Sequence, residues 1–252
     1  MLAVARHQYI LEQLQQNGSV KVADLSEHLG VTPKTVREDL EKLEENGLLR
    51  RTHGGAVAIP DSDSILPLLQ IPNTKFPLEK EAIAAYALRY IRPEEVIALD
   101  AGSTTLEIAR LLPNEPMTVV TNDLMIMREL VGKERIQLVV PGGYRHNNVL
   151  IGNDSLEWVN RLNIQKVFLS AAGIHEKYGL SVFTGELIKL KKAFIAGAKE
   201  IFAVADHSKF DRATLLTFAS LEDVDVIITD AGLDEDTLRR YERSSVRIEQ
   251  AV

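Results

Sequence analysis

The stretch "VTPKTVREDLEKLEENGLLRRTHGG", residues 31–55, has the pattern of a capped helix followed by a short hairpin. Thr32 is a typical N-cap residue, and Pro33 suits the first helical position because its missing N–H has no intrahelical partner there. Apolar residues then recur at i, i+4 and i+7 from Val36, which predicts one buried stripe. The Asn-Gly pair at 46–47 predicts the end of the helix, and the basic residues that follow predict a small hairpin.

The sequence before this stretch supplies two more helices. Apolar residues share one face of a helix predicted between Val4 and Gln15, and Asn17-Gly18 predicts its end. In "ADLSEHLG", Leu25 and Leu29 are four residues apart, and Gly30 closes a second short helix. A short helix, a tight turn and a capped helix are the parts of a helix-turn-helix motif, to which the hairpin adds the wing of a winged helix.

The pattern changes after this N-terminal module. Four prolines and no clean periodicity predict a linker at 58–76. Beyond it, apolar runs end in small or polar residues: "VIALDAGSTT", "TVVTND", "IQLVVPGG", "KVFLSAAG", "IFAVADHSK" and "VDVIITD". Helices are predicted between several of them, at 104–112, 123–131 and 185–198. Alternating strands and helices predict a mainly parallel sheet covered on both faces, with ligands beyond the carboxyl ends of the strands.

The predicted fold class is therefore α/β, with an N-terminal winged helix-turn-helix domain at 1–57 and a larger α/β domain at 77–252. With 252 residues, 45% hydrophobic residues and 26% charged residues, the chain resembles an ordinary globular protein. It has no cysteine, which excludes disulfides and thiolate metal sites. It also lacks an apolar run of ~20 residues and a signal-peptide pattern, so we expect a cytoplasmic protein without a membrane partner.

Charge placement points to the front of the third helix as a DNA-binding surface. The net charge of −7 argues against attraction to nucleic acid over the whole chain, but a local basic edge remains compatible with it. The acids Glu41, Glu44 and Glu45 lie in later turns, so only the N-terminal end is expected to enter a major groove. The predicted DNA contacts on the helix and the wing are Thr32, Lys34, Thr35, Arg37, Arg50, Arg51 and His53. A solvated helix or a helix that binds a protein partner is the alternative.

A second candidate site follows the first strand of the larger domain. In "DAGSTT", Gly102 permits close backbone approach, three hydroxyl residues follow it, and the N–H groups that open the next helix form an anion cradle. The loop lacks the Walker lysine and the GxGxxG spacing, which disfavours nucleotide binding. A plain helix cap is the alternative. Polar groups after the other strands would line the same edge, where carboxylates and amides suit sugar hydroxyls and lysine suits a phosphate.

The string at 31–55, together with Gly18, Val20, Val22, Leu25 and the downstream "DAGSTT", "TND", "GG" and "ADHSKF", resembles the DeoR family of bacterial transcriptional regulators over nearly the full chain. Two positions depart from the family pattern. Thr32 stands where the family usually has serine, and Glu38 follows Arg37 where the family usually has a second arginine. Threonine keeps the capping hydroxyl, whereas the acid puts a phosphate contact at position 38 in doubt.

The resemblance implies a sensor domain with the sugar-phosphate isomerase fold that binds a phosphorylated sugar or a related metabolite. Carried over by motif, the candidate effector-binding residues are Asp100, Gly102, Ser103, Thr104, Thr105, Thr121, Asn122, Gly142, Gly143, Asp206 and Lys209. Glu186 and Lys189 match the family's Glu-x-x-Lys spacing at the start of a helix. They are equally compatible with an exposed charged helix face shared with Lys191 and Lys192.

The function predicted from these features is a DNA-binding regulator, a repressor of a carbohydrate-utilisation operon that a phosphorylated sugar releases from double-stranded operator DNA. Helix-turn-helix proteins usually read paired half-sites, so we expect a homodimer or homotetramer. No cofactor is expected, and no metal, since the histidines lack metal-ligand spacing. The alternatives are a sugar-phosphate isomerase-like enzyme, because the carboxylates and lysines of the second site include possible acids and bases, and a winged helix that binds only protein.

Overall fold

The computed structural model describes residues 3–45, 48–57, 75–243 and 246–251. The chain divides into two compact units, Met1–Lys75 and Phe76–Val252. The predicted linker lies outside the described residues, apart from Lys75 and Phe76. No helix in the described part of the chain is long and apolar enough to cross a membrane.

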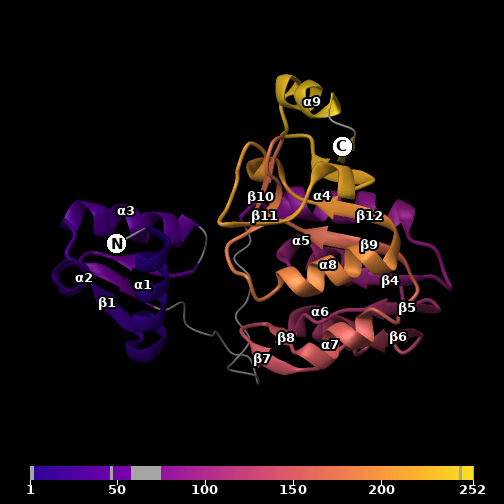
Figure 1. Cartoon of the computed structure of the whole chain (residues 1–252), viewed down its shortest axis with the longest axis horizontal. Coiled ribbons are helices and arrows are strands. Elements are labelled where there is room, and N and C mark those ends of the chain that lie inside the picture. The colour runs from indigo at the N-terminus through magenta and orange to yellow at the C-terminus, as the bar shows by residue number, and fades with distance from the viewer. Residues whose placement is uncertain (1–2, 46–47, 58–74, 244–245, 252) are drawn as a thin grey trace. The chain divides into compact units, whose positions relative to one another are not determined.

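The first unit contains the helix-turn-helix and wing that the sequence predicts (Figure 1). Its elements are α1 (Ala3–Asn17), β1 (Ser19–Lys21), α2 (Val22–Leu29), α3 (Pro33–Glu45), β2 (Arg50–Thr52) and β3 (Gly55–Val57). The predicted cap is confirmed, because the N–H of Thr35 donates to Thr32 Oγ1 at 3.2 Å. The wing strands β2 and β3 pair antiparallel, and β1 adds a third strand next to β3 that the sequence pattern did not predict.

A buried carboxylate fixes α3 against α1. Asp39, in the middle of α3, is 2% exposed. Its two oxygens accept hydrogen bonds from Arg6 Nε at 2.7 Å and Arg6 Nη2 at 3.0 Å, and His7 Nε2 lies 2.9 Å from Oδ1. Burial alone raises the pKa of Asp39, but the bonds from Arg6 and His7 outweigh it and hold this pKa below its ordinary value. The orientation of α3 thus depends on a charge pair as well as on the apolar stripe.

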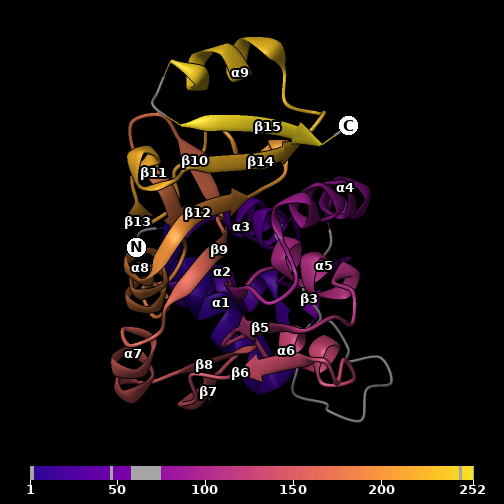
Figure 2. The same cartoon turned by 90° about the vertical axis from the view of Figure 1, so that its right-hand side faces the viewer.

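The second unit is built on a parallel sheet of seven strands in the order β15-β14-β12-β9-β4-β5-β6 (Figure 2). The strands are β4 (Val96–Leu99), β5 (Met117–Val120), β6 (Ile136–Val139), β9 (Ile164–Ser170), β12 (Ala198–Val204), β14 (Val226–Asp230) and β15 (Arg247–Ala251). The first six coincide with the six apolar runs of the sequence. The chain proceeds outward from β4 through β5 to β6, then returns to β9 on the other side of β4. The strand order therefore reverses between β4 and β9.

Helices cover both faces of this sheet. Figure 2 shows α4, α5 and α6 on one side and α7 and α8 on the other. The helices of this unit are α4 (Pro77–Ala87), α5 (Ser103–Leu111), α6 (Leu124–Leu130), α7 (Asn153–Val159), α8 (Ile188–Gly197) and α9 (Glu235–Glu242), with 3-10 turns η1 (Leu88–Tyr90), η2 (His207–Lys209) and η3 (Leu221–Asp223). The doubly covered parallel sheet confirms the predicted α/β class.

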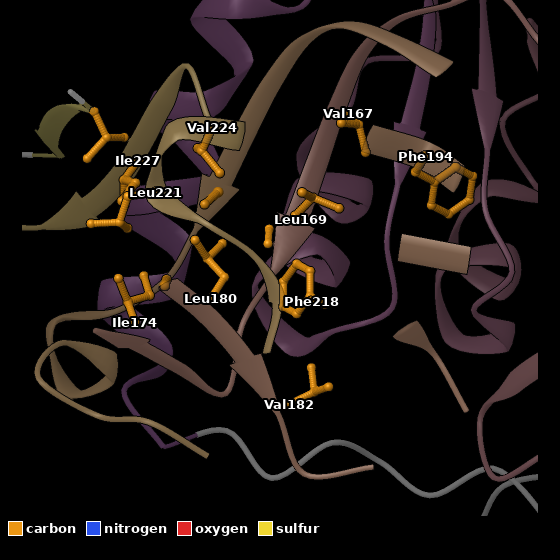
Figure 3. Close-up of a cluster of buried hydrophobic side chains, with 14 of the residues drawn as sticks. Val167, Leu169, Ile174, Leu180, Val182, Phe194, Phe218, Leu221, Val224 and Ile227 are labelled. Atoms are coloured by element: carbon orange, nitrogen blue, oxygen red, sulfur yellow. The ribbon is translucent and has the colours of Figure 1, made fainter. Parts of the chain in front are cut away.

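Two small antiparallel elements complete the unit. One is a hairpin of β7 (Tyr144–His146) and β8 (Val149–Ile151), and the other is a sheet of β10 (Gly173–His175), β11 (Gly179–Val182) and β13 (Leu216–Ala219). Leu180 and Phe218 of this second sheet share a buried apolar cluster with Leu169 of β9 and Phe194 of α8 (Figure 3). The large sheet, α8 and the small sheet are therefore joined by one core.

We expect Arg6→Met to weaken the attachment of α3 to α1. Removing one partner of a fully buried ion pair typically costs about 3–5 kcal/mol. Here we expect a loss of roughly 2 kcal/mol, because His7 remains as a partner and Arg6 is partly exposed. Hydrogen exchange of α3 peptides measures the change, with the exposed Arg50→Met as the matched control. Adding Asp39→Asn to Arg6→Met should recover part of the protection. Unchanged exchange in Arg6→Met would contradict this role.

Candidate functional site

The exposed front of α3 presents one basic side chain without an ion pair. Lys34 Nζ lies 3.8 Å from Glu38 Oε1, in a pair that is exposed on both sides. Arg37 is exposed, and within the described residues it has no hydrogen bond or ion pair. The hydroxyls of Thr32 and Thr35 lie 3.0 Å apart and take part in the cap. Arg37 is thus the cation most readily available to an anion at this end of the helix.

The wing arginines differ from each other. Arg51 Nη1 lies 3.3 Å from Glu41 Oε1, its Nε lies 3.8 Å from Glu44 Oε2, and its N–H donates to Glu44 at 2.7 Å. The sequence predicts Arg51 as a DNA contact, and the structure pairs it with two acids of α3. Arg50 and His53 are exposed. Arg51 therefore compensates the acidic turns of α3, a pairing that the sequence reading missed.

In the second unit, the loop after β4 lies at the point where strand order reverses, the usual ligand position in open α/β sheets. Gly102 is held close to β9, because a Cβ at this position would lie 2.4 Å from the Cβ of Ser170. The need for glycine is thus explained by Ser170 as well as by the expected approach of a ligand. Any larger residue at position 102 would push the loop away from β9.

The helix that follows this loop begins without a side-chain cap. The N-cap position of α5 is Gly102, which has no side chain that could accept from the first turn. Thr105 Oγ1 instead donates to the carbonyl of Gly102 at 2.9 Å, and the Thr104 side chain is 5% exposed. Ser103 is partly exposed. The first N–H groups of α5 are therefore free to bind an anion, as the sequence predicts for this loop.

Asp100, expected to face a sugar hydroxyl, is instead part of a buried ion pair. Its Oδ2 accepts from Lys191 Nζ, and from the N–H and the hydroxyl of Ser170 at 3.0 Å each. Lys191 is 1% exposed, so the alternative reading that placed it on an exposed helix face is wrong. Sequence reasoning missed both Lys191 and Ser170. The only available signal was that Lys191 falls on the apolar face of α8.

Polar groups after β5 complete the next part of the edge. Thr121 is fully buried, and its Oγ1 accepts from the N–H of Asp123 at 3.2 Å. The Asn122 amide donates to the carbonyl of Leu150 at 3.1 Å, while its buried Oδ1 has no hydrogen-bond partner among the described residues. Asp123 caps α6 by accepting from the N–H groups of Met125 and Ile126. Asn122 Oδ1 is thus available to a ligand hydroxyl.

A second cluster gathers after β12. Asp206 is 1% exposed, and its Oδ1 accepts from Ser208, whereas Oδ2 has no hydrogen bond within the described part of the chain. Lys209 Nζ lies 4.0 Å from Oδ2. Lys80 of α4 is 3% exposed, and burial lowers its pKa, opposed by the nearby Asp206 carboxylate and reinforced by Lys209. Lys80 was not among the predicted site residues.

The remaining candidates lie further from the reversal point. Gly142 and Gly143 follow β6, the edge strand, with φ of 78° and 113°. Glu186 and Lys189 are exposed. The helix α8 begins at Ile188, three residues later than predicted, so Glu186 lies before the helix. The pKa of Glu186 is lowered chiefly by its own backbone N–H, with contributions from Thr184 and His146. No described contact joins these four residues to the Asp100 or Asp206 clusters.

A surface hollow lies elsewhere in the unit. It has a volume of about 370 Å³ between α8 and β13, and none of the predicted effector residues lines it. The described residues contain no group of three or more His, Asp or Glu side chains placed to hold a metal ion. The polar groups after β5 and β12 are better suited to bind a polar ligand than this hollow, because they include buried oxygens without a described hydrogen bond and nearby lysines.

Comparisons with known proteins agree over both units. Residues 6–62 match the family model of the DeoR-like helix-turn-helix domain, and residues 75–231 match that of the DeoR C terminal sensor domain. The HTH-type transcriptional regulator YulB of Bacillus subtilis (strain 168), itself uncharacterized, is 35% identical over 98% of this chain and 96% of its own length. The glycerol-3-phosphate regulon repressor of Escherichia coli (strain K12) is 32% identical over 92% of each chain. A ribose 5-phosphate isomerase of Methanocaldococcus jannaschii matches 52% of this chain and 53% of that chain, at 19% identity and a TM-score of 0.39.

The buried carboxylate of Asp123 should make the free energy of unfolding of the second unit larger at low pH than at neutral pH. Burial raises its pKa from 3.8 to about 6, against the two backbone N–H groups that lower it, and the nearby Asp100 raises it further. The folded state therefore holds this proton more tightly, and stability falls as the pH rises through the window from about 4 to 6. Asp123→Asn keeps a capping side chain and should remove this loss.

We expect Asp123→Asn to stabilise the second unit at pH 7 by on the order of 2 kcal/mol, with little gain at pH 4. Urea unfolding followed by the fluorescence of Trp158, the single tryptophan, measures the difference. Asp234→Asn is the matched control, because Asp234 also caps a helix but its pKa is lowered by the N–H of Thr237. A pH-independent effect of Asp123→Asn would contradict the assignment.

Proposed function

Because the chain belongs to the DeoR family of helix-turn-helix transcriptional regulators, we propose that it represses a carbohydrate-utilisation operon and leaves its operator when a phosphorylated sugar binds the second unit. The observation that carries this proposal is the pairing, in one chain, of an exposed basic helix end with a strand-end anion cradle. The relative named as a glycerol-3-phosphate regulon repressor supports a phosphorylated metabolite as the effector.

In this proposal the N-terminal end of α3 enters the major groove. Arg37 supplies the principal cationic contact, because the ammonium of Lys34 is shared with Glu38. Thr32, Thr35 and the first N–H groups of the helix add contacts to phosphate. Arg50 and His53 of the wing hold the flanking backbone, and Arg51 keeps the acids of α3 from repelling it.

The effector binds beyond the carboxyl ends of β4, β5 and β12 in this proposal. Its phosphate accepts from the uncapped N–H groups of α5 and from the hydroxyls of Ser103 and Thr104. Lys80 and Lys209 supply positive charge, and the unpaired oxygens of Asn122 and Asp206 accept hydrogen bonds from sugar hydroxyls. Thr121, Gly142 and Gly143 shape the edge around these groups.

A regulator fits these residues better than an isomerase-like enzyme. General acid or base catalysis needs a group that can reach the substrate and exchange a proton with it. The Oδ2 of Asp100 is occupied by Lys191 and Ser170. Glu186 and Lys189 are exposed. We therefore propose that the chain binds its sugar phosphate without turning it over.

The route from effector to DNA begins at the end of the linker. Phe76, where the second unit starts, packs edge-on against His207 with ring centroids 4.8 Å apart. His207 lies between Asp206 and Lys209, and its Nδ1 lies 2.7 Å from Asp230 Oδ2. An effector that moves this loop therefore displaces the residue that leads into the linker. In a cytoplasmic homodimer or homotetramer this displacement would change the spacing of two winged helices on paired half-sites.

Arg37→Ala should weaken operator binding and flatten its salt dependence by about one unit of slope if Arg37 contacts a phosphate. If Arg37 reads a base, the cost should instead be roughly 1–3 kcal/mol, with relaxed preference at one position. Arg51→Ala should also weaken operator binding, because it leaves the negative charges of Glu41 and Glu44 uncompensated. Adding Glu41→Gln and Glu44→Gln to Arg51→Ala should then restore part of the affinity. Fluorescence anisotropy over a salt series measures these effects.

The control for both variants is Arg239→Ala, an exposed arginine of α9 in the second unit, which should leave operator affinity unchanged. Effector affinity should be the same in Arg37→Ala and the parent. Normal operator binding in both Arg37→Ala and Arg51→Ala would argue for a protein partner of the winged helix instead.

The effector should bind with its phosphate at the loop 102–105. Thr104→Asp places a carboxylate in the cradle and should abolish binding by repulsion without unfolding the unit. Lys209→Ala should still bind operator yet fail to release it at effector concentrations that free the parent, because effector and operator affinities are reciprocally linked. Calorimetry with sugars and their phosphate esters gives the affinities. Equal affinity for a sugar and its ester would rule out the phosphate assignment.

A further inference from the structure

Lys191 brings a positive charge into the core of the second unit. Its side chain crosses from α8 to the reversal point of the sheet, where Nζ donates to Asp100 and, at 2.9 Å, to the carbonyl of Ser170. Nζ also lies 4.7 Å from the ring centroid of Phe218 in the small sheet. Four elements of the unit, α8, β9, the β4 loop and β13, thus meet at one ammonium group.

Stability alone is a weak reason for such a pair. Removing two charges from water costs several kcal/mol per ion, so apolar replacements of buried ion pairs are often as stable as the pair itself. Lys191 and Asp100 are 1% and 2% exposed, and Lys191 lies over the ring of Phe218, a member of the apolar core of the unit. The charges at this point therefore call for a functional explanation.

The position of Asp100 supplies that explanation. Asp100 lies two residues before Gly102, where the anion cradle begins, and a second buried carboxylate, Asp123, is close enough to interact with it electrostatically. An uncompensated charge on Asp100 would repel an anion at the loop, strongly so in a site of low dielectric. Lys191 cancels that charge. Because its Nζ is already engaged by Asp100 and Ser170, Lys191 acts through these residues and does not contact the ligand.

We infer that Lys191 is a positioning residue for the anionic effector: by neutralising Asp100 it allows the loop at 102–105 to accept a negative charge. Lys191 Nζ also lies 3.5 Å from the hydroxyl of Ser170, the side chain against which Gly102 packs, and so helps to hold the loop in place. This role rests on the proposed function, since it requires that the second unit binds an anion at this loop.

The experiment measures the binding of inorganic phosphate to the full chain by calorimetry. Lys191→Met should weaken phosphate binding about tenfold or more, because it leaves Asp100 uncompensated. Asp100→Asn should tighten phosphate binding, because the positive charge of Lys191 is then no longer cancelled by a carboxylate. The double variant, which removes both charges, should bind within about threefold of the parent. Lys192→Met, an exposed neighbour on α8, is the matched control and should bind like the parent.

The signs of these changes separate an electrostatic role from a merely structural one. If the pair only held the fold together, both single variants would weaken binding, the double variant would not recover, and the inference would be overturned. If Lys191→Met does not fold, judged by its thermal midpoint, the sign of Asp100→Asn still decides. If the parent and Lys191→Met bind phosphate with the same affinity, the role of Lys191 is overturned, but the anion site itself is not. No phosphate binding by the parent overturns the anion site of the proposed function as well.

Discussion

The reversal of strand order between β4 and β9 is the constraint on which the second unit depends. Parallel strands on either side of this point send their connections to opposite faces, so the carboxyl ends of β4 and β9 diverge and leave room at the edge. The loop after β4 fits there only because position 102 has no side chain to meet Ser170. The buried charges of Asp100 and Lys191 meet at the same point. Sheet topology, loop geometry and electrostatics are thus tied to one location.

Much of the architecture was predictable because its causes are local. The cap at Thr32, the apolar stripe of α3 and the six apolar runs each act within a few residues, and each appears as predicted. The strands β1 and β15 were missed because "SVK" and "RIEQA" have no apolar run of their own. Both are strands because of their neighbours: β3 supplies hydrogen bonds to β1, and β14 supplies them to β15. Pairing of this kind cannot be read from the short strand itself.

The site was predictable in its residue types but not in its pairings. The sequence "DAGSTT" predicts an anion-binding loop, but the residues near Asp100 do not indicate its partner. That partner, Lys191, is 91 residues away, in the run "KLKK", whose charges predict a solvated helix face. Arg51 shows the same limit, since its acids lie on a different element. Charge composition predicts which groups are present, whereas the fold decides which charges remain free. Among the described residues, that leaves Arg37 of α3 without an ion pair and one oxygen of Asp206 after β12 without a hydrogen bond.

The signalling route that we propose between the two units does not require the large sheet to deform. A packed parallel sheet is stiff, and a small ligand supplies little energy to bend it. The loop after β12, however, contacts the start of the second unit directly, through His207 and Phe76. Phe76 is held with φ of 60°, an uncommon conformation for a residue with a bulky side chain, so its backbone is sensitive to the position of the ring. Lys80 lies one turn further along the helix that Phe76 caps, and its N–H donates to the carbonyl of Phe76. In the proposed function, an anion held by Lys80 and Lys209 would therefore act on both sides of Phe76, where the second unit begins.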